Sequence, residues 1–361
     1  MTVSTQPPHR RAWIEVDLAN LLANARTVRA ASRSGTLLPM VKANAYGLGA
    51  VPVVRALESL DPWGYGVATV EEGIELRDAG VTRPILVFTP AASDQLARYR
   101  RHDLRAVLDA PAEVARWDLP FHLEIDTGMG RCGVRWDDAA ALTQFATPHL
   151  EGVFTHFYAA DSDRATVALQ WGRFEEALGR LPARPRLVHA ANSAAAWRLD
   201  RALDLARPGI FLYGGAAAGD LPDPAPVATI RAPVVSVRRI GAGDAVSYGA
   251  EWRAERPTAI ATLGIGYADG IPRAVKGKAF ALLGGRRRPI VGRVTMDFVM
   301  VDMETDDLDG VRVGEVATLV GTSPEGGEAI GIDEFAGWAG TISYEILARL
   351  GNRVTRVYTG A

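Results

Sequence analysis

Residues 37–47 read LLPMVKANAYG, a short apolar run that ends in a lysine and a loop of small residues. Similar apolar runs recur up to about residue 206, and longer stretches with apolar residues three and four apart separate them. The runs that we predict as strands are Leu37–Val41, Gly64–Ala68, Ile85–Phe88, Leu104–Leu108, Phe121–Ile125, Gly152–Thr155, Arg186–His189 and Leu203–Ala206. Parallel strands need crossovers, and closing a sheet removes its unpaired edges, so this pattern predicts a (β/α)8 TIM barrel. An open doubly wound sheet is the alternative.

Periodic stretches between these runs predict the crossover helices. The predicted helices are Val70–Asp78, Asp138–Phe145, Ala165–Leu181 and Ala194–Leu199. A further helix precedes the first strand, with Asp17 as its N-cap and an apolar face that includes Leu18 and Leu21.

The character of the chain changes after Arg207. Residues 214–219 are small and flexible, and three prolines lie between Leu221 and Pro226, which indicates a junction. Short β-branched runs follow at Val234–Val237, Thr258–Leu263, Pro289–Val291, Phe298–Val301 and Val316–Val320, with one helical stretch at Asp333–Gly340 and Ile342–Leu350. We therefore predict a barrel at 12–220 and a mainly β domain at 227–361, joined by the first residues of the chain.

Composition limits the partners. Lys and Arg number 40 against 42 Asp and Glu, and a net charge of −2 gives no general attraction to nucleic acid or anionic lipid. The first eleven residues lack the apolar run of a signal peptide, and no stretch approaches the roughly 18 apolar residues that cross a bilayer. The single cysteine, Cys132, cannot form an intrachain disulfide. We expect a cytoplasmic protein with small-molecule or protein partners, no nucleic acid, no membrane and no metal site.

Reactive side chains follow several predicted strands. Barrel enzymes place their sites at the carboxyl ends of the strands, where this sequence has Lys42, Arg131, His156, Asn192, Ser193 and residues 207–210. A lysine that leaves a buried strand can form a Schiff base if desolvation or a neighbouring cation lowers its pKa. Ser193 and the backbone of Gly209 and Ile210 are suited to a phosphate group, although Ser193 alone could equally be a helix cap.

The sequence resembles bacterial alanine racemases in ordered segments over nearly its whole length. The matching segments are 42–47 (KANAYG), 126–131 (DTGMGR), 155–157 (THF), 191–193 (ANS), 207–210 (RPGI), 247–249 (SYG), 265–270 (IGYADG), 296–297 (MD) and 340–345 (GTISYE). The resemblance implies a homodimer of two-domain subunits, in which the β domain of one subunit completes the active site of the other.

The resemblance also implies roles for individual residues. Lys42 would hold pyridoxal 5′-phosphate and exchange protons on one face of alanine, and Tyr248 of the partner subunit would serve the opposite face. The remaining residues implied to contact the cofactor are Tyr46, His156, Asn192, Ser193, Arg207, Gly209, Ile210 and Tyr344. Residues implied for the substrate are Arg131, Met296 and Tyr267, with Glu124 and Asp297 in support. The product would be D-alanine for cell-wall peptidoglycan.

Two of these residues bear on mechanism. A tyrosine of ordinary pKa is a poor base at neutral pH, so Tyr248 needs positive charge nearby, for which His156 and Arg207 are candidates. Similarity places Arg207 against the pyridine nitrogen, where a guanidinium donates a hydrogen bond without protonating the ring. The ring is then a weaker electron sink, which favours reprotonation over transamination.

The sequence departs from some relatives at Glu124. Several relatives carry a lysine there that becomes carbamylated and orients the arginine at position 131. Because a glutamate already supplies the anion, we expect activity that does not depend on carbon dioxide. Thr295 and Phe298, where relatives often have cysteine and glutamine, bear on substrate fine-tuning.

Other functions remain open at this point. A racemase for serine, lysine or another small amino acid would share the pattern. A non-catalytic pyridoxal-phosphate-binding protein would resemble the barrel but lack the second domain and the opposing tyrosine. A basic amino acid decarboxylase of related fold would place a carboxylate, not Arg207, at the pyridine.

Overall fold

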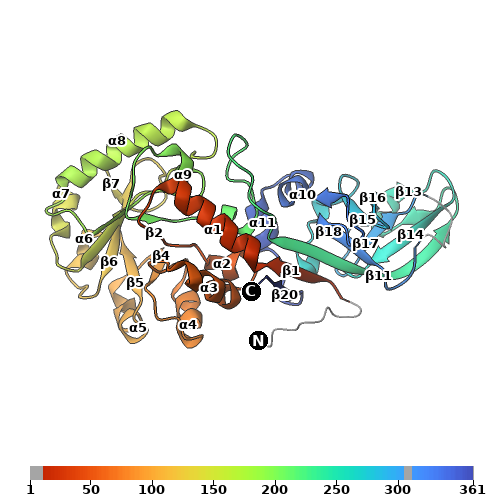
Figure 1. Ribbon diagram of the computed structural model, residues 1–361, viewed down its shortest axis with the longest axis horizontal. Coiled ribbons are helices and arrows are strands. Elements are labelled where there is room, and N and C mark those ends of the chain that lie inside the picture. Colours follow the sequence, from red (N-terminus) through yellow and green to blue (C-terminus); the bar gives the residue numbers. More distant parts are fainter. Residues whose placement is uncertain (1–10, 305–310, 361) are drawn as a thin grey trace.

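The computed structural model describes residues 11–304 and 311–360; Met1–Arg10, where we expected no signal peptide, lie outside this range. A body of strands ringed by helices and a second body made mostly of strands lie beside each other along the long axis (Figure 1). Within the described ranges, no helix combines the length and the apolar character needed to cross a membrane.

The first body contains an eight-stranded parallel sheet in the order β2-β10-β9-β8-β6-β5-β4-β3, with the short β7 (Val134–Arg135) paired to β6. The strands on this path are β2 (Thr36–Leu37), β3 (Tyr65–Val67), β4 (Ile85–Pro90), β5 (Arg105–Leu108), β6 (Phe121–Asp126), β8 (Leu150–Phe154), β9 (Leu187–His189) and β10 (Leu205–Ala206). A parallel bridge between Met40 and Gly66 joins its two ends, and the amide of Val41 donates to the carbonyl of Gly66 at 2.8 Å. The barrel prediction is confirmed.

The first barrel strand is shorter than predicted. We expected Leu37–Val41, but β2 ends at Leu37, although the amide of Leu38 still donates to Ala206 at 2.8 Å and the carbonyl of Pro39 accepts from Gly66 at 2.9 Å before the bridge of Met40. Pro39 explains the break, because proline has no N–H to donate to a ladder.

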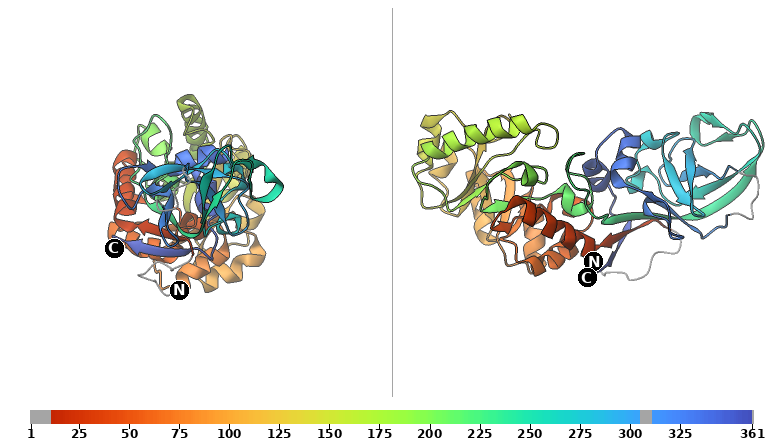
Figure 2. Two further views of the ribbon diagram at one scale, coloured as in Figure 1. Left: turned by 90° about the vertical axis from the view of Figure 1, so that its right-hand side faces the viewer. Right: turned by 45° about the horizontal axis from the view of Figure 1, so that its top comes forward.

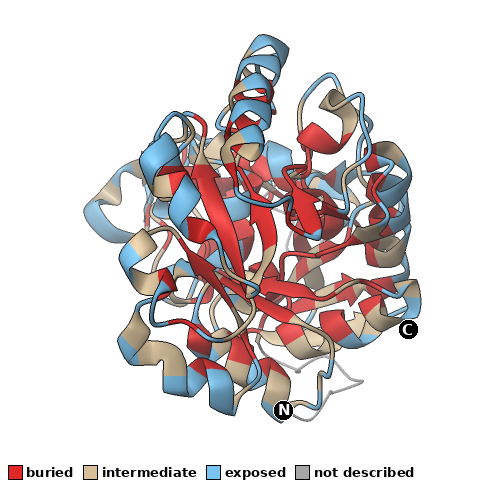
Figure 3. Ribbon diagram, turned by 90° about the vertical axis from the view of Figure 1, so that its left-hand side faces the viewer, coloured by how far each residue is buried: buried red, intermediate tan, exposed pale blue. Residues whose placement is uncertain are grey.

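Helices cover the outside of the barrel. They are α1 (Leu18–Ser32), α3 (Ala50–Leu57), α4 (Val70–Asp78), α5 (Leu96–Arg101), α6 (Pro111–Val114), α7 (Ala139–Leu142), α8 (Arg164–Arg180) and α9 (Ala195–Arg198). Asp17 caps α1 as predicted, since its carboxylate accepts from the amide of Asn20 at 2.9 Å. Figure 3 shows the buried strands inside this layer and the exposed outer faces of the helices.

The inside of the barrel is filled by side chains from alternate strand positions. An apolar cluster occupies it, formed by Leu38, Leu86, Val107, Phe154, Leu187 and Leu205. His122 and Glu124 of β6 are also buried, and because they are two residues apart they share one face of that strand. Polar groups are therefore built into the barrel interior beside its apolar core.

The second body is a β domain with its own sheet, in the order β19-β18-β15-β16-β17-β14-β11-β1-β20. Its strands are β1 (Trp13–Asp17), β11 (Ala228–Ile240), β14 (Thr258–Leu263), β15 (Phe280–Leu283), β16 (Arg286–Val291), β17 (Val299–Asp302), β18 (Val316–Thr322), β19 (Ala329–Ile330) and β20 (Thr355–Thr359). Since β18 pairs with both β15 and β11, the strands from β11 to β18 close into a small barrel. The mainly β character predicted for this region is confirmed.

Both ends of the described chain contribute to this second sheet. β1 pairs with β11 in antiparallel fashion and with β20 in parallel. The helices α10 (Ile332–Ala339) and α11 (Ser343–Ala348) agree with the predicted helical stretch, and α11 packs against the turn that follows β2. The second domain therefore contacts the loop that carries Lys42.

Candidate functional site

Lys42 begins a turn with an unusual backbone. The turn, α2 (Lys42–Tyr46), has φ values of 52°, 55°, 52° and 53° at its last four residues, Ala43 to Tyr46. Left-handed helical geometry costs L-residues roughly 1–2 kcal/mol each, so this turn stores roughly 4–8 kcal/mol. Such strain persists only where the surroundings hold the backbone in place, and it is typical of functional sites.

Contacts from both domains hold this turn. On the barrel side, Glu72 accepts from the amide of Ala43 at 2.6 Å. On the other side, Arg356 of β20 donates to the carbonyl of Gly47 from Nε at 3.0 Å and from Nη2 at 2.8 Å. Gly47 itself has φ +82°, and a Cβ there would lie 2.2 Å from the carbonyl oxygen of Leu347 in α11. The position of Lys42 is therefore set by two domains.

The pKa of the Lys42 amine lies below its ordinary value. Burial is the largest cause that lowers its pKa, and the positive charges of Arg131 and Arg207 lower it further, while Glu72 opposes them. Lowering the pKa makes free amine available closer to neutral pH, as Schiff-base chemistry requires.

Arg207 lies at the end of β10 and is 3% exposed. Its Nη2 donates to the carbonyl of Thr155 at 2.9 Å, and its Nη1 donates to Nδ1 of His189 at 2.8 Å. Burial lowers its pKa to about 10, which still leaves the guanidinium charged at neutral pH. Its hydrogen bonds to neutral acceptors therefore fix a buried cation at the rim of the barrel.

Glu124 and Arg131 form the acidic and basic pair that the sequence predicted. Arg131 Nη2 lies 3.5 Å from Glu124 Oε1, and the Glu124 side chain is buried whereas that of Arg131 is 51% exposed. Burial raises the pKa of Glu124, and the charges of Arg131 and Arg207 counteract that effect. Glu124 therefore contacts the guanidinium of an arginine whose side chain is about half exposed.

His156 does not supply the positive charge that we expected of it. Burial lowers its pKa to about 3, and the neighbouring charges of Arg207, Arg131 and Lys42 contribute to this shift. The ring is neutral at neutral pH, so of the two candidates only Arg207 is a cation.

Ser193 and Gly209 meet where the sequence predicted an anion site. The amide of Gly209 donates to Oγ of Ser193 at 3.0 Å, and Ser193 does not cap α9, because Asn192 accepts from the amide of Ala195 instead, at 2.9 Å. Ile210 follows, fully buried, in a 3-10 turn. A Cβ at position 209 would lie 2.4 Å from the hydroxyl of Tyr46, so only glycine fits there.

Two further tyrosines line the same region. Tyr46 stacks on Tyr213 with ring centres 4.6 Å apart, and Tyr344 of α11 lies 6.0 Å from Tyr46. Burial raises the pKa of Tyr46 above its ordinary value and that of Tyr344 to about 12, so both hydroxyls stay protonated and available as donors. Tyr213 was not predicted from sequence, because nothing in its short apolar segment distinguishes it from core residues.

The other predicted site residues gather in the second domain. Tyr248, Met296 and Asp297 line a pocket of about 420 Å³, and Tyr248 is 70% exposed. Tyr267 lies close by, since its amide donates to the carbonyl of Thr295 at 2.9 Å. Tyr248 lies in the sequence between β12 (Ala245–Val246) and β13 (Trp252–Arg253), and Figure 1 shows β13 at the end of the β domain far from α2. One chain therefore holds two separate groups of candidate residues.

Arg353 supports this second group and was missed in the sequence. It donates to Asp297 at 2.8 Å, to the carbonyl of Met296 at 3.2 Å and to the buried Asp269 at 2.6 Å. Its position more than fifty residues from Asp297 in the sequence gives no local signal. Asp297 thus fixes the loop of Met296 through an arginine from the end of the chain.

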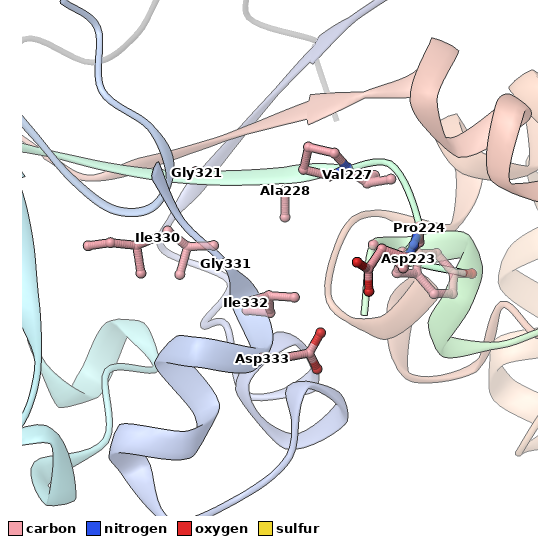
Figure 4. A pocket seen from close by; sticks show the side chains of 13 residues that line it. Asp223, Pro224, Val227, Ala228, Gly321, Ile330, Gly331, Ile332 and Asp333 are labelled. Carbon is pink, nitrogen blue, oxygen red and sulfur yellow. The ribbon is translucent and has the colours of Figure 1, made fainter. Parts of the chain in front are cut away.

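A further pocket of about 220 Å³ lies at the junction of the domains (Figure 4). Its lining includes Asp223 and Asp333, and none of the predicted site residues. Asp333 accepts from the amide of Ala216 at 2.8 Å, so it fastens α10 to the end of the barrel.

These features define a class of protein: a two-domain barrel enzyme with a lysine of lowered pKa at the carboxyl ends of the strands. The family model described as "Alanine racemase, N-terminal domain" matches residues 16–217 of this chain. The family model described as "Alanine racemase, C-terminal domain" matches residues 227–358. The chain belongs to the alanine racemase family, a family of isomerases.

Individual relatives agree with this assignment. The alanine racemase of Symbiobacterium thermophilum is 41% identical, over 97% of this chain and 98% of that protein. The crystal structure of alanine racemase from Bacillus anthracis with bound L-Ala-P is 32% identical and has a TM-score of 0.90, covering 99% of this chain and 97% of that one. A histidine racemase from Leuconostoc mesenteroides is 26% identical and has a TM-score of 0.87, covering 99% of this chain and all of the other, 100%.

Proposed function

We propose that this protein interconverts L- and D-alanine with pyridoxal 5′-phosphate held on Lys42. The observation that carries the proposal is the half-buried lysine with a lowered pKa on a strained turn at the barrel rim. Membership of the alanine racemase family supports the choice of reaction and substrate. The D-alanine formed would serve the peptidoglycan of the cell wall.

The residues at the barrel rim fit this cofactor. Lys42 offers an amine for its aldehyde, and Arg207 offers a fixed donor for its ring nitrogen. The junction of Ser193 and Gly209, where a side chain at 209 would meet the Tyr46 hydroxyl, suits a phosphate group. When bound, the cofactor withdraws electrons from the α-carbon of the amino acid, so that its hydrogen can leave as a proton.

Racemisation needs a proton donor and acceptor on each face of the α-carbon. Lys42 serves one face, and Tyr248 of the partner subunit serves the other. The buried charge of Arg207 stabilises the phenolate of that tyrosine, since His156 is neutral. The two directions of reaction then use the same pair of residues in exchanged roles.

Arg131 binds the carboxylate of the substrate, with Glu124 orienting its guanidinium. The backbone of Met296 from the partner subunit adds to this site, and Tyr344 and the partner subunit's Tyr267 restrict the width of the entrance. A narrow entrance favours a methyl side chain.

The active site is shared between two copies of the chain. Within one chain, Tyr248 precedes β13, which lies at the far end of the β domain (Figure 1), and its 70% exposure is unusual for a catalytic residue in a complete site. A homodimer that places this tyrosine over the barrel rim of the other copy completes both sites.

Complementation tests the shared site. Lys42→Ala and Tyr248→Phe should each abolish racemisation in a chiral assay, and Tyr158→Phe, another exposed tyrosine, should not. Mixing the two inactive variants should recover about a quarter of wild-type activity, because half of the dimers are mixed and each contains one intact site. Failure to recover activity, with mixed dimers demonstrated, would disprove the shared site.

A second candidate is racemisation of another amino acid, because a histidine racemase has the same fold at a TM-score of 0.87. The chiral assay with L-alanine, L-serine and L-histidine separates the candidates. No turnover of any of them by cofactor-loaded protein would leave a cofactor-binding protein as the function.

A further inference from the structure

A series of polar side chains, the buried Arg207, His189 and His122 followed by the partly buried Glu151, leads through the inside of the barrel. Arg207 Nη1 lies 2.8 Å from His189 Nδ1, and His189 Nε2 lies 2.7 Å from His122 Nδ1. His122 Nε2 then faces Glu151 Oε2 at 3.7 Å. The two histidines have no exposed surface at all (0%), and the chain runs from the carboxyl end of β10 to the amino end of β8.

The donors and acceptors in this series of side chains can be arranged in only one way. A guanidinium has only donors, so His189 must accept at Nδ1 and carry its hydrogen on Nε2. That hydrogen is donated to Nδ1 of His122, which must therefore carry its own hydrogen on Nε2. Both rings are neutral and both are Nε2–H tautomers, since a proton on either Nδ1 would place two donors against each other.

A carboxylate terminates the chain. His122 Nε2 and Glu151 Oε2 lack a conventional hydrogen bond, as does Arg105 Nε, which lies 3.4 Å from the same oxygen. Glu151 Oε2 is thus the acceptor that both nitrogen atoms face. Burial raises the pKa of Glu151, but His122, Arg105 and Arg186 together outweigh that effect and lower it, so the group is a carboxylate at neutral pH.

The packing around the chain is built for the two rings. His122 pairs in register with Gly152 of β8, where a Cβ would lie 2.5 Å from His122 Nδ1. Phe154 stacks on His189 with ring centres 5.0 Å apart and planes 12° apart. Any side chain at position 152 would displace the ring that connects His189 to Glu151.

We propose that His122 and Glu151 are positioning residues, which hold His189 in its Nε2–H tautomer so that Arg207 is kept as a fixed hydrogen-bond donor at the cofactor site. The tautomers of His189 and His122 follow from this geometry alone, whereas their effect on catalysis rests on the proposed function. Loss of the chain frees His189 to rotate, and the guanidinium then loses one of its two anchors.

Nitrogen NMR of the full-length protein labelled with ¹⁵N-histidine tests the order directly, with or without cofactor. We expect His189 and His122 to show protonated Nε2 and unprotonated Nδ1 throughout the range in which the protein is folded. His102 and His149 do not belong to this hydrogen-bonded series. They serve as reference signals and as the targets of His→Gln controls. An Nδ1–H tautomer or an imidazolium at either buried ring would overturn the proposal.

Variants test the coupling. In His122→Gln the amide oxygen accepts from His189 and the amide nitrogen donates to Glu151, so we expect the His189 signals and the activity of the wild type. In His122→Leu the Nε2–H of His189 loses its acceptor, and we expect shifted His189 signals, a kcat lower by about tenfold and an almost unchanged KM for alanine.

Glu151→Gln gives a test that does not depend on the folding of His122→Leu. Removal of the charge should shift the His122 and His189 signals together, and a change confined to His122 would contradict a connected chain. Altered His189 signals with normal kcat would show that the chain exists but does not position Arg207, which also refutes the proposal. Absence of all racemisation in wild-type protein with the expected tautomers would instead refute the proposed function.

Discussion

Arg356→Met should weaken the turn that carries Lys42, although position 356 belongs to the other domain. Arg356 donates to the carbonyls of Gly47 (3.0 and 2.8 Å), Leu350 (2.9 Å), Gly351 (2.7 Å) and Val354 (2.6 Å). Methionine fills similar space but donates nothing. A hydrogen bond from a charged group contributes roughly 1.5–3 kcal/mol, and such contributions are not additive within one network, so we expect a loss of about 3–4 kcal/mol.

That loss approaches the roughly 4–8 kcal/mol of strain stored in the four left-handed residues of the turn. The midpoint temperature of thermal unfolding should therefore fall by about 6–8 °C, at roughly 2 °C per kcal/mol for a chain of this size. Because Arg356 binds the carbonyl of Gly47 next to the turn, the affinity for the cofactor should fall as well, by tenfold or more. Absorbance titration of protein from which the cofactor has been removed measures this change.

Arg349→Met is the matched control. Its side chain is 62% exposed and pairs with Glu345 one helical turn away, so its removal should cost less than about 0.5 kcal/mol. If Arg356→Met lost stability but bound cofactor normally, the turn would not depend on the hydrogen bonds from Arg356, and the reasoning would be wrong.

Three further predictions concern the barrel rim. Arg207→Glu should raise the fraction of turnovers that end in transamination, and equal partition in mutant and wild type would contradict the role given to this arginine. Added bicarbonate should leave activity unchanged, because Glu124 already supplies the anion beside Arg131; a large gain would show otherwise. Cofactor binding by stripped protein should depend on a free amine whose pKa lies below the ordinary 10.5 of lysine, so the association rate should level off below that pH; a midpoint at or above 10.5 would refute the lowered pKa of Lys42.

The barrel could be predicted because its signal is local and repeated. Each strand is a short apolar run, and the prediction of Val70–Asp78 agrees with α4 at both ends. Thr69 and Glu72 form a capping box at its N-terminus. The second domain was predicted only in outline. β11 runs over Ala228–Ile240, far beyond the predicted Val234–Val237, because it pairs with different partners along its length and charged residues in it face outward.

The site shows the same division between local and distant information. Lys42, Arg207 and Ser193 were predicted because they follow strands of a barrel. The left-handed turn was not, because positive φ at Ala43 to Tyr46 contradicts local preference and is held by Glu72 and by the second domain. The neutrality of His156 also escaped prediction, since it results from burial among cations that are distant in sequence.

Under the proposed function, the position of Tyr248 explains why one chain needs both domains. Side chains at the ends of the barrel strands, Lys42 and Arg207 among them, all approach a ligand from the rim, so a group for the opposite face of a substrate must come from another body. The chain's own hairpin of β12 and β13 lies at the far end of the β domain (Figure 2), whereas β20 of the same domain braces the Lys42 turn through Arg356. One domain thus serves two sites under the proposed function: it stabilises the lysine of its own barrel and carries the tyrosine to the barrel of the partner subunit. Dissociation to monomers should for that reason abolish racemisation while leaving the lysine and its cofactor in place.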